Sequence, residues 1–238
     1  AGIRMKAEKD GDEWVLNGQK VWTSGAHFAD YGMIVARSDP TALKHKGLTY
    51  FYVDMKTPGI EAKPIKQISG SANFNEVFFN DVRIPDSQRI GAEGDGWKVS
   101  LTTLMNERLA VGDPPGLDFD QIFEASKEIE VEDGLAVKNS EVRQKMADWY
   151  IQSRGLQYTK YRSMTALSKG QTPGPELSIS KLVTASKMQD VSSYALDLMD
   201  MSGMVHQDKN PILKNLFQNG YFFSAAMRIA GGTDEVLR

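Results

Sequence analysis

The sequence contains no cysteine and only three histidines, His27, His45 and His206. Without cysteine there can be no disulfide framework, no thiolate nucleophile and no zinc–thiolate site. Three histidines scattered along the chain also disfavour a histidine-based metal site, so we expect no metal ion. A cysteine-free chain fits a reducing compartment.

The sequence also lacks a strong charge bias and any long apolar run. Its 28 Lys and Arg residues against 31 Asp and Glu residues give a formal net charge of −3. This balance offers no broad surface for neutralising phosphates, so nucleic acid is not an expected partner. No segment approaches the roughly 18 consecutive apolar residues of a membrane span, and no secretory leader is recognisable. With 238 residues, 41% of them hydrophobic, the chain can bury a core of one large or two small domains.

Short apolar runs separated by turn residues dominate the chain up to about residue 90. Asp10-Gly11 and Asn17-Gly18 are dipeptides that tight hairpin turns favour, because both tolerate positive φ. They predict turns on either side of a short strand at 13–16. Further strands are expected at 19–23, 31–36, 48–53, 60–65 and 77–79. Strands without interleaved helices predict an antiparallel barrel or sandwich rather than a Rossmann unit.

After Gly96 the apolar residues follow a helical period. We predict a first helix that ends at Gly112, followed by helices at 117–130, 140–167, 176–199 and 211–229. The buried stripe expected for the helix at 140–167 is Val142, Met146, Trp149, Ile151 and Leu156. The sequence therefore predicts an α+β protein, with an antiparallel β-barrel or sandwich domain at 1–91 and an α-helical bundle at 92–238.

Trp22-Thr23-Ser24-Gly25 closes one expected strand and opens a loop. A tryptophan beside hydroxyls and backbone N–H groups can cover one face of a flat ring and bind its edge. A core tryptophan capped by a turn is the simpler interpretation of the same residues.

Glu107 lies in the first expected helix among weakly polar neighbours. The residues three and four positions away, which share its helical face, are Thr103, Leu104, Ala110 and Val111. A carboxylate there is either paired with a neighbouring helix or desolvated. Desolvation would raise its pKa and make it a better base at neutral pH.

The turn Gly231-Gly232-Thr233 follows the last expected helix. Backbone N–H groups in such a turn can hold a phosphate or the edge of a cofactor, and Thr233 suits the cap of a new helix. A plain helix C-cap would account for the same glycines.

Taken in order along the chain, these segments resemble the acyl-CoA dehydrogenases, flavoproteins with a middle β-domain followed by a helical bundle. The resemblance covers nearly the whole chain. It rests on LNGQKVWTSGA at 16–26, ADY at 29–31, GLTYF at 47–51, FNEVFFNDVRIP at 74–85, GDGW at 94–97 and NER at 106–108.

The resemblance implies an FAD cofactor between the two domains and an acyl-CoA substrate stacked on it. In such enzymes a glutamate removes the α-proton while the β-hydrogen leaves as hydride. The residues implied to contact FAD are Trp22, which covers the flavin, Thr23, Ser24, Thr233 and Glu235. Those implied to contact the CoA part of the substrate are Asn106 and Arg108.

The family places its catalytic glutamate at either of two positions. In many members it immediately precedes the Gly-Thr of the final turn, where this sequence has Gly231. In others, including the isovaleryl-type and long-chain enzymes, it lies in the first bundle helix directly before an arginine. Glu107-Arg108 fits the second placement, so we expect Glu107 to be the base.

Three departures limit what the resemblance implies. The given sequence starts after the region where the family has its N-terminal helical domain and its Ser-Glu-Pro segment. An Arg-x-x-Phe-Gly motif that reaches a neighbouring subunit's FAD is missing from 117–139, and the segment that holds the adenine with a Gln reads MDMSG at 199–203. We therefore expect a homo- or hetero-oligomer, in which a homologous subunit can supply the missing arginine.

The function implied is an FAD-dependent acyl-CoA dehydrogenase of bacterial β-oxidation that acts on a fatty or bulky acyl-CoA. It would pass electrons to an electron-transfer flavoprotein or a similar acceptor. The alternatives are a non-catalytic structural subunit that completes a partner's site, and an acyl-CoA oxidase that passes electrons to oxygen. A bacterial cytoplasmic location is expected, with the mitochondrial matrix as the alternative.

Overall fold

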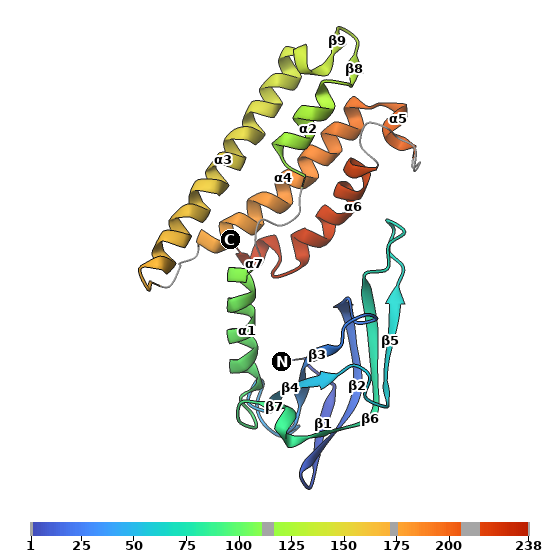
Figure 1. The fold of residues 1–238 in the computed structure, drawn as a ribbon, viewed down its shortest axis with the longest axis vertical. Helices are drawn as coiled ribbons and strands as arrows, with labels where there is room; N and C mark the ends of the chain where they lie inside the picture. Colours follow the sequence, from blue (N-terminus) through green and yellow to red (C-terminus); the bar gives the residue numbers. More distant parts are fainter. Residues whose placement is uncertain (1, 111–116, 172–175, 206–214, 238) are drawn as a thin grey trace. The chain divides into compact units, whose positions relative to one another are not determined.

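The computed structural model describes residues 2–110, 117–171, 176–205 and 215–237, with the backbone alone at residues 105–110 and 177. The chain divides into two compact units, Ala1–Val111 and Gly112–Arg238 (Figure 1). The first consists mainly of strands and the second mainly of helices. The predicted α+β class, with the β-unit before the helices, is confirmed.

A seven-stranded sheet forms most of the first unit, in the order β5-β6-β2-β1-β3-β4-β7. The pairing of β1 with β3 is parallel, and the other strand pairings of this sheet are antiparallel. The sheet therefore follows the expected antiparallel arrangement except at this junction. The strands are β1 (Lys6–Asp10), β2 (Glu13–Ser24), β3 (Tyr31–Arg37), β4 (Leu48–Asp54), β5 (Ile60–Ile65), β6 (Phe74–Pro85) and β7 (Arg89–Ile90), with a 3-10 turn, η1 (Asp86–Gln88), before the last.

The predicted turn at Asn17-Gly18 is wrong, because β2 runs straight through these residues. The register between β2 and β6 shifts between Leu16 and Gly18, which marks a β-bulge. Gly18 has φ 139°, and a Cβ there would lie 2.9 Å from the Cα of Met5. The glycine thus permits a close backbone approach inside a strand. The predicted turn at Asp10-Gly11 does join β1 to β2, with Gly11 at φ 62°.

The core of the first unit is built from side chains that alternate along the strands. Trp14 and Phe51 are among the largest fully buried side chains, and their rings meet edge-on with centroids 5.3 Å apart. The indole Nε1 of Trp14 donates a hydrogen bond to Asp86 Oδ1 at 2.7 Å. The one polar atom of this ring is therefore satisfied at the edge of the core.

Helix α1 (Gly96–Ala110) packs on β3 and β4 within the first unit. Near its start Trp97 stacks on His45, with ring centroids 4.3 Å apart and an interplanar angle of 15°. Leu101 and Leu104 continue the same helical strip and are 44% and 48% exposed. The strip therefore carries apolar side chains that the first unit does not cover.

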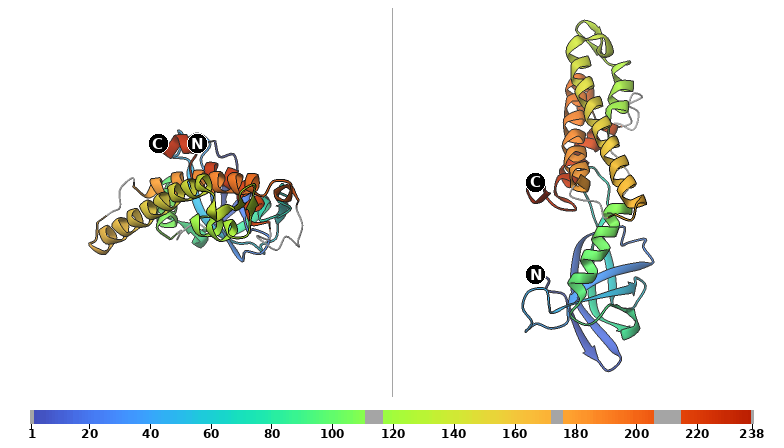
Figure 2. Two further views of the ribbon diagram at one scale, coloured as in Figure 1. Left: turned by 90° about the horizontal axis from the view of Figure 1, so that it is seen from above. Right: turned by 90° about the vertical axis from the view of Figure 1, so that its left-hand side faces the viewer.

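The second unit contains a long pair of helices, α3 and α4, against which shorter elements pack (Figures 1 and 2). Its helices are α2 (Phe119–Ser126), α3 (Ser140–Ser168), α4 (Glu176–Leu198), α5 (Met201–Met204), α6 (Leu216–Ile229) and α7 (Asp234–Leu237). A small hairpin, β8 (Glu130–Val131) and β9 (Gly134–Leu135), and the 3-10 turn η2 (Ala136–Lys138) lie between α2 and α3.

Two of the predicted helices have different limits in the structure. The helix expected at 117–130 ends at Ser126, and Glu130–Val131 starts the hairpin instead, because the chain turns at Glu132-Asp133 and Gly134, at φ 108°, begins the second strand. The helix expected at 211–229 is described from Leu216, since residues 206–214 lie outside the described part of the chain. The short helix α5 was not predicted.

Most of the stripe predicted for α3 faces the core of the second unit. Val142, Met146 and Trp149 are buried, and the indole Nε1 of Trp149 donates to Asp190 Oδ2 on α4 at 2.8 Å. Ile151 is 66% exposed, which corrects its place in the stripe. It follows Trp149 by two residues, and two residues turn a helix by about 200°, onto the opposite face.

An ion pair between a buried lysine and a half-buried aspartate ties α2, α3 and α4 together. Lys187 on α4 is 3% exposed, and its Nζ donates to Asp118 Oδ1 and to Ser153 Oγ, each at 2.8 Å. Asp118 also caps α2 by accepting a hydrogen bond from the Phe119 N–H, in a capping box with Gln121. Burial raises the pKa of Asp118, but the hydrogen bonds from Lys187, Ser153 and the Phe119 N–H together outweigh burial and lower this pKa.

Replacing Asp118 should destabilise the second unit. Asp118→Ala leaves the Lys187 ammonium buried without a counter-charge, and we expect a loss of about 3 kcal/mol. This is the lower end of the range for buried pairs, because the Asp118 side chain is itself 45% exposed. Since the folded pKa of Asp118 is depressed, its contribution is present above the unfolded pKa of about 3.9 and is lost as pH falls through the folded value.

Urea unfolding at neutral and acidic pH measures both effects. The double substitution Asp118→Ala with Lys187→Met removes the buried charge as well and should recover part of the lost stability. An Asp118→Ala protein as stable as the wild type at neutral pH would contradict this account of the ion pair.

Candidate functional site

Trp22 lies near the end of β2 in a left-handed backbone conformation, with φ 60°. The register between β2 and β6 shifts between Lys20 and Thr23, so Trp22 belongs to a second bulge of this strand. A positive φ is unusual for a bulky residue and costs about 1–3 kcal/mol. The indole is 62% exposed and meets Phe74 edge-on, with ring centroids 6.2 Å apart. The interpretation of Trp22 as a core residue is therefore wrong.

Asn75 on β6 anchors the backbone that follows Trp22. Asn75 is buried, and it lies on the same inward face of β6 as Val77 and Phe79, which follow at alternate positions. Its Nδ2 donates to the Thr23 carbonyl at 2.9 Å, and its Oδ1 lies 3.0 Å from Nδ1 of His27. Because Nδ2 is the donor to a carbonyl, Oδ1 is the acceptor and His27 donates through Nδ1. Asn75 had no predicted role, although an amide in an inward-facing strand position is the signal of such an anchor.

The loop after Ser24 is closed by backbone hydrogen bonds around Gly25. The Gly25 N–H donates to the Asn73 carbonyl at 2.9 Å, and its carbonyl accepts from the N–H groups of Phe28 and Ala29 at 3.0 Å. Gly25 has φ 66°, and a Cβ there would lie 2.7 Å from the Phe28 ring. Thr23, which is half-buried, and Ser24, which is exposed, are therefore presented from a fixed turn next to Trp22.

Lys20 joins β2 to β3 where no backbone ladder connects them. Strand β1 separates β2 from β3 but pairs with β3 only through Lys6 and Arg37. Past the end of β1, Lys20 Nζ on β2 donates to the Val35 carbonyl on β3 at 2.6 Å, and burial lowers the pKa of this lysine.

Large apolar side chains are exposed on β2, β3, β4 and the loop after β2. They are Val21, Trp22, Phe28, Tyr31, Met33 and Tyr52.

Asn106, Glu107 and Arg108 lie in the C-terminal half of α1. The structure describes the helical backbone at these positions, and their side chains lie outside the described part. Successive positions of a helix are rotated by about 100°, so the three residues stand at different angular positions around α1. Thr103 and Leu104 precede Glu107 on its own face. The roles of these three residues stay predictions.

In the second unit, the turn Gly231-Gly232-Thr233 joins α6 to α7. Gly231 and Gly232 both have positive φ, at 68° and 112°. The Thr233 carbonyl accepts from the N–H groups of Val236 and Leu237 at 3.0 and 3.1 Å, so Thr233 directly precedes the first turn of α7. Thr233 is half-buried and Glu235 is exposed.

An open depression of about 280 Å³ lies beside this turn. Within it Arg228 Nε donates to Asp234 Oδ2 at 2.7 Å, and Arg228 Nη1 donates to Gln189 Oε1 at 2.8 Å. The hydrogen bond from Arg228 lowers the pKa of Asp234 in spite of its burial. Neither Arg228 nor Asp234 was predicted, although an arginine in the last turn of one helix and an acid in the first turn of the next suit both helix dipoles. The depression is lined by Gln189, Ala225, Arg228, Ile229, Asp234 and Glu235.

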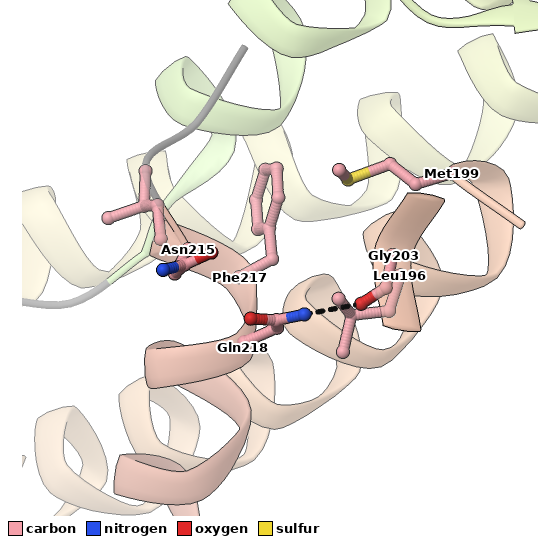
Figure 3. A pocket seen from close by; sticks show the side chains of 7 residues that line it. Leu196, Met199, Gly203, Asn215, Phe217 and Gln218 are labelled. Atoms are coloured by element: carbon pink, nitrogen blue, oxygen red, sulfur yellow. Dashed lines mark hydrogen bonds between the residues drawn. The ribbon is translucent and has the colours of Figure 1, made fainter. Parts of the chain in front are cut away.

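A much smaller cavity, of about 10 Å³, lies where α5 and α6 meet (Figure 3). Gln218 Nε2 on α6 donates to the Gly203 carbonyl at 2.6 Å. This side-chain amide therefore reaches the segment at 199–203, where Met199 stands in place of the glutamine expected from the family pattern. Gln218 Oε1 and Asn215 Oδ1 are buried there, with no hydrogen-bond partner among the described residues. A cavity of this size holds at most one water molecule.

Within the described ranges, no three His, Asp or Glu side chains are grouped as metal ligands. Nor does any helix of the described chain have the length and apolar character needed to cross a membrane.

Known proteins resemble both units of the chain. Acyl-CoA dehydrogenase FadE34 of Mycobacterium tuberculosis is 35% identical over 239 residues, which cover 100% of this chain and 32% of FadE34. Acyl-CoA dehydrogenase IpdE1 of the same species is 34% identical, with coverage of 100% and 60%. The solved structure of the Tcur3481-Tcur3483 steroid ACAD has a TM-score of 0.85 at 26% identity, with coverage of 100% and 61%. The chain thus spans from about a third to three-fifths of the length of these relatives.

Family models match almost the entire sequence. The acyl-CoA dehydrogenase middle domain matches residues 1–82, and the acyl-CoA dehydrogenase C-terminal domain matches residues 94–238. The chain therefore belongs to the acyl-CoA dehydrogenase family.

Proposed function

We propose that this chain forms part of an FAD-dependent acyl-CoA dehydrogenase, which introduces a double bond between the α and β carbons of an acyl-CoA thioester. The observation that carries the proposal is the Trp22 ring, held 62% exposed by a bulge in a conformation that is unfavourable for tryptophan. A large aromatic ring kept out of the core at a cost in stability indicates a ligand surface.

The residues present fit FAD. A flavin ring needs an aromatic face and donors at its edge, and Trp22 with the Thr23 and Ser24 hydroxyls provides both. A dinucleotide also needs hydrogen-bond donors for its phosphates, and its sugar hydroxyls can donate to a carboxylate. In the second unit Thr233 and Glu235 lie beside the depression that Arg228 lines, and we assign them to FAD.

Bound FAD supplies a hydride acceptor, which amino-acid side chains cannot provide. We assign the proton transfer to Glu107, whose carboxylate takes the α-proton of the thioester. We assign the CoA part of the substrate to Asn106 and Arg108, since a guanidinium matches the geometry of a phosphate.

We propose a functional boundary between a middle domain at 1–91 and a helical bundle at 92–238. This boundary falls between the two family matches, which end at residue 82 and begin at residue 94. We infer a bulky acyl group as the substrate class, because the Tcur3481-Tcur3483 structure is described as a steroid ACAD.

The partners proposed are an acyl-CoA, an electron-transfer flavoprotein or similar acceptor, and at least one further subunit. The segments at 117–139 and 199–203 depart from the family pattern at positions that serve FAD, and this favours a homologous subunit that completes the site. The same departures support the second candidate function, a structural subunit without its own turnover. Flavin content of the purified full-length protein, alone and with homologous subunits, distinguishes the two.

Glu107→Gln should lower kcat by about 10²–10⁴-fold while FAD stays bound. The amide keeps the size and hydrogen-bonding capacity of the carboxylate but cannot accept the proton. Steady-state kinetics with flavin quantification measures the effect. A variant that keeps more than a tenth of wild-type activity would exclude Glu107 as the base.

Trp22→Gly should weaken FAD binding without unfolding the first unit. Glycine adopts the φ of 60° found at this position without strain, so we expect the apoprotein to be at least as stable as the wild type. Trp22→Phe keeps an aromatic face and should retain more FAD than Trp22→Gly. Chemical unfolding and FAD titration check both effects. A loss of about 3–5 kcal/mol, as for a buried tryptophan, would contradict the proposed role.

A further inference from the structure

Lys181 on α4 binds the turn that joins α6 to α7. Its side chain is 19% exposed. Its Nζ donates to the Gly232 carbonyl at 2.6 Å and to the Arg228 carbonyl at 3.0 Å, and Asp234 Oδ1 lies 3.5 Å away. Two of the three N–H donors of the ammonium therefore make hydrogen bonds to backbone carbonyls, and the nearby Asp234 carboxylate balances its charge.

The Asp234 carboxylate connects this lysine to a second cation. Asp234 is 3% exposed, and Arg228 Nε donates to its Oδ2 at 2.7 Å. Arg228 also donates to Gln189, which lies on α4 like Lys181. Arg228 stands in the last turn of α6 and Asp234 in the first turn of α7. Both ends of the turn are therefore tied to one helix.

The turn has little rigidity of its own. Two successive glycines have the widest backbone freedom of any dipeptide, and α7 is a single four-residue helix, too short to be stable alone. The Arg228 carbonyl is one of those that the end of α6 leaves without an intrahelical partner, and Lys181 satisfies it from the neighbouring helix. The conformation of residues 231–233 thus depends on contacts with α4.

We propose that Lys181 is a positioning residue for the cofactor. By holding the Gly232 and Arg228 carbonyls it fixes the turn that carries Thr233 and Glu235, and it acts through the backbone rather than by touching FAD. This role rests on the proposed function, in which Thr233 and Glu235 contact FAD. A turn that is already ordered loses less entropy on binding, so removing Lys181 weakens FAD binding and leaves the chemistry of the filled site unchanged.

Lys181→Met tests this role, because methionine keeps most of the aliphatic stem and removes every donor. In the full-length protein we expect the FAD dissociation constant to rise by about 10- to 100-fold. In the apoprotein, hydrogen exchange should accelerate at the Val236 and Leu237 amides, which bond to the Thr233 carbonyl. Saturating FAD should restore kcat, with KM for acyl-CoA unchanged.

Two further variants give the comparison its controls. Lys145→Met makes the same change at a lysine of α3 that pairs with Asp190 at 3.3 Å and has no part in the turn, and it should leave FAD affinity unchanged. Lys181→Arg keeps the charge and the donors and should recover much of the affinity.

The outcomes separate this role from the proposed function. Wild-type FAD affinity in Lys181→Met would overturn the role of Lys181 and leave the proposed function standing. Faster exchange throughout α3 and α4 would indicate general destabilisation and would overturn the role as well. A wild-type protein that does not bind FAD would refute the proposed function, and the role with it.

Discussion

The bulge at the end of β2 is the constraint on which the proposed cofactor site depends. Side chains alternate between the two faces of a strand, so one extra residue decides which face Trp22 occupies. The shift between Lys20 and Thr23 brings the indole to the surface, and Asn75 then holds the Thr23 carbonyl from the buried side. Without this bulge the same residues would form an ordinary strand with its tryptophan in the core.

In the second unit, charged side chains fix the backbone that carries the residues assigned to FAD. The Gly231-Gly232-Thr233 turn is flexible by composition, and Lys181, Arg228 and Asp234 hold it from the side of α4. In both units the residues assigned to FAD are exposed or half-buried, whereas the residue that fixes their backbone is largely buried. This division lets the contact residues face a ligand while the fold around them stays ordered.

Much of this architecture could be predicted from the sequence, because turn residues mark the ends of many strands and apolar periodicity distinguishes the strands from the helices. Asp10-Gly11 and Asn17-Gly18 show where the prediction fails, since both dipeptides tolerate positive φ and only pairing with β6 makes the second one a bulge. The buried stripe predicted for α3 is wrong at Ile151, because a residue two positions after Trp149 does not fit the helical period of about 3.6 residues. Asn75, Lys181 and the contact of Arg228 with Gln189 escaped prediction because these hydrogen bonds join residues at least 39 positions apart in the chain.

The most direct test of the account is anaerobic mixing of the full-length protein with acyl-CoA thioesters of different bulk while the flavin absorbance is followed. The account predicts that the protein carries FAD and that a bulky acyl-CoA bleaches the oxidised flavin band, rapidly in the wild type and far more slowly in Glu107→Gln. A protein that binds no flavin, or whose bound flavin no acyl-CoA reduces, would contradict it.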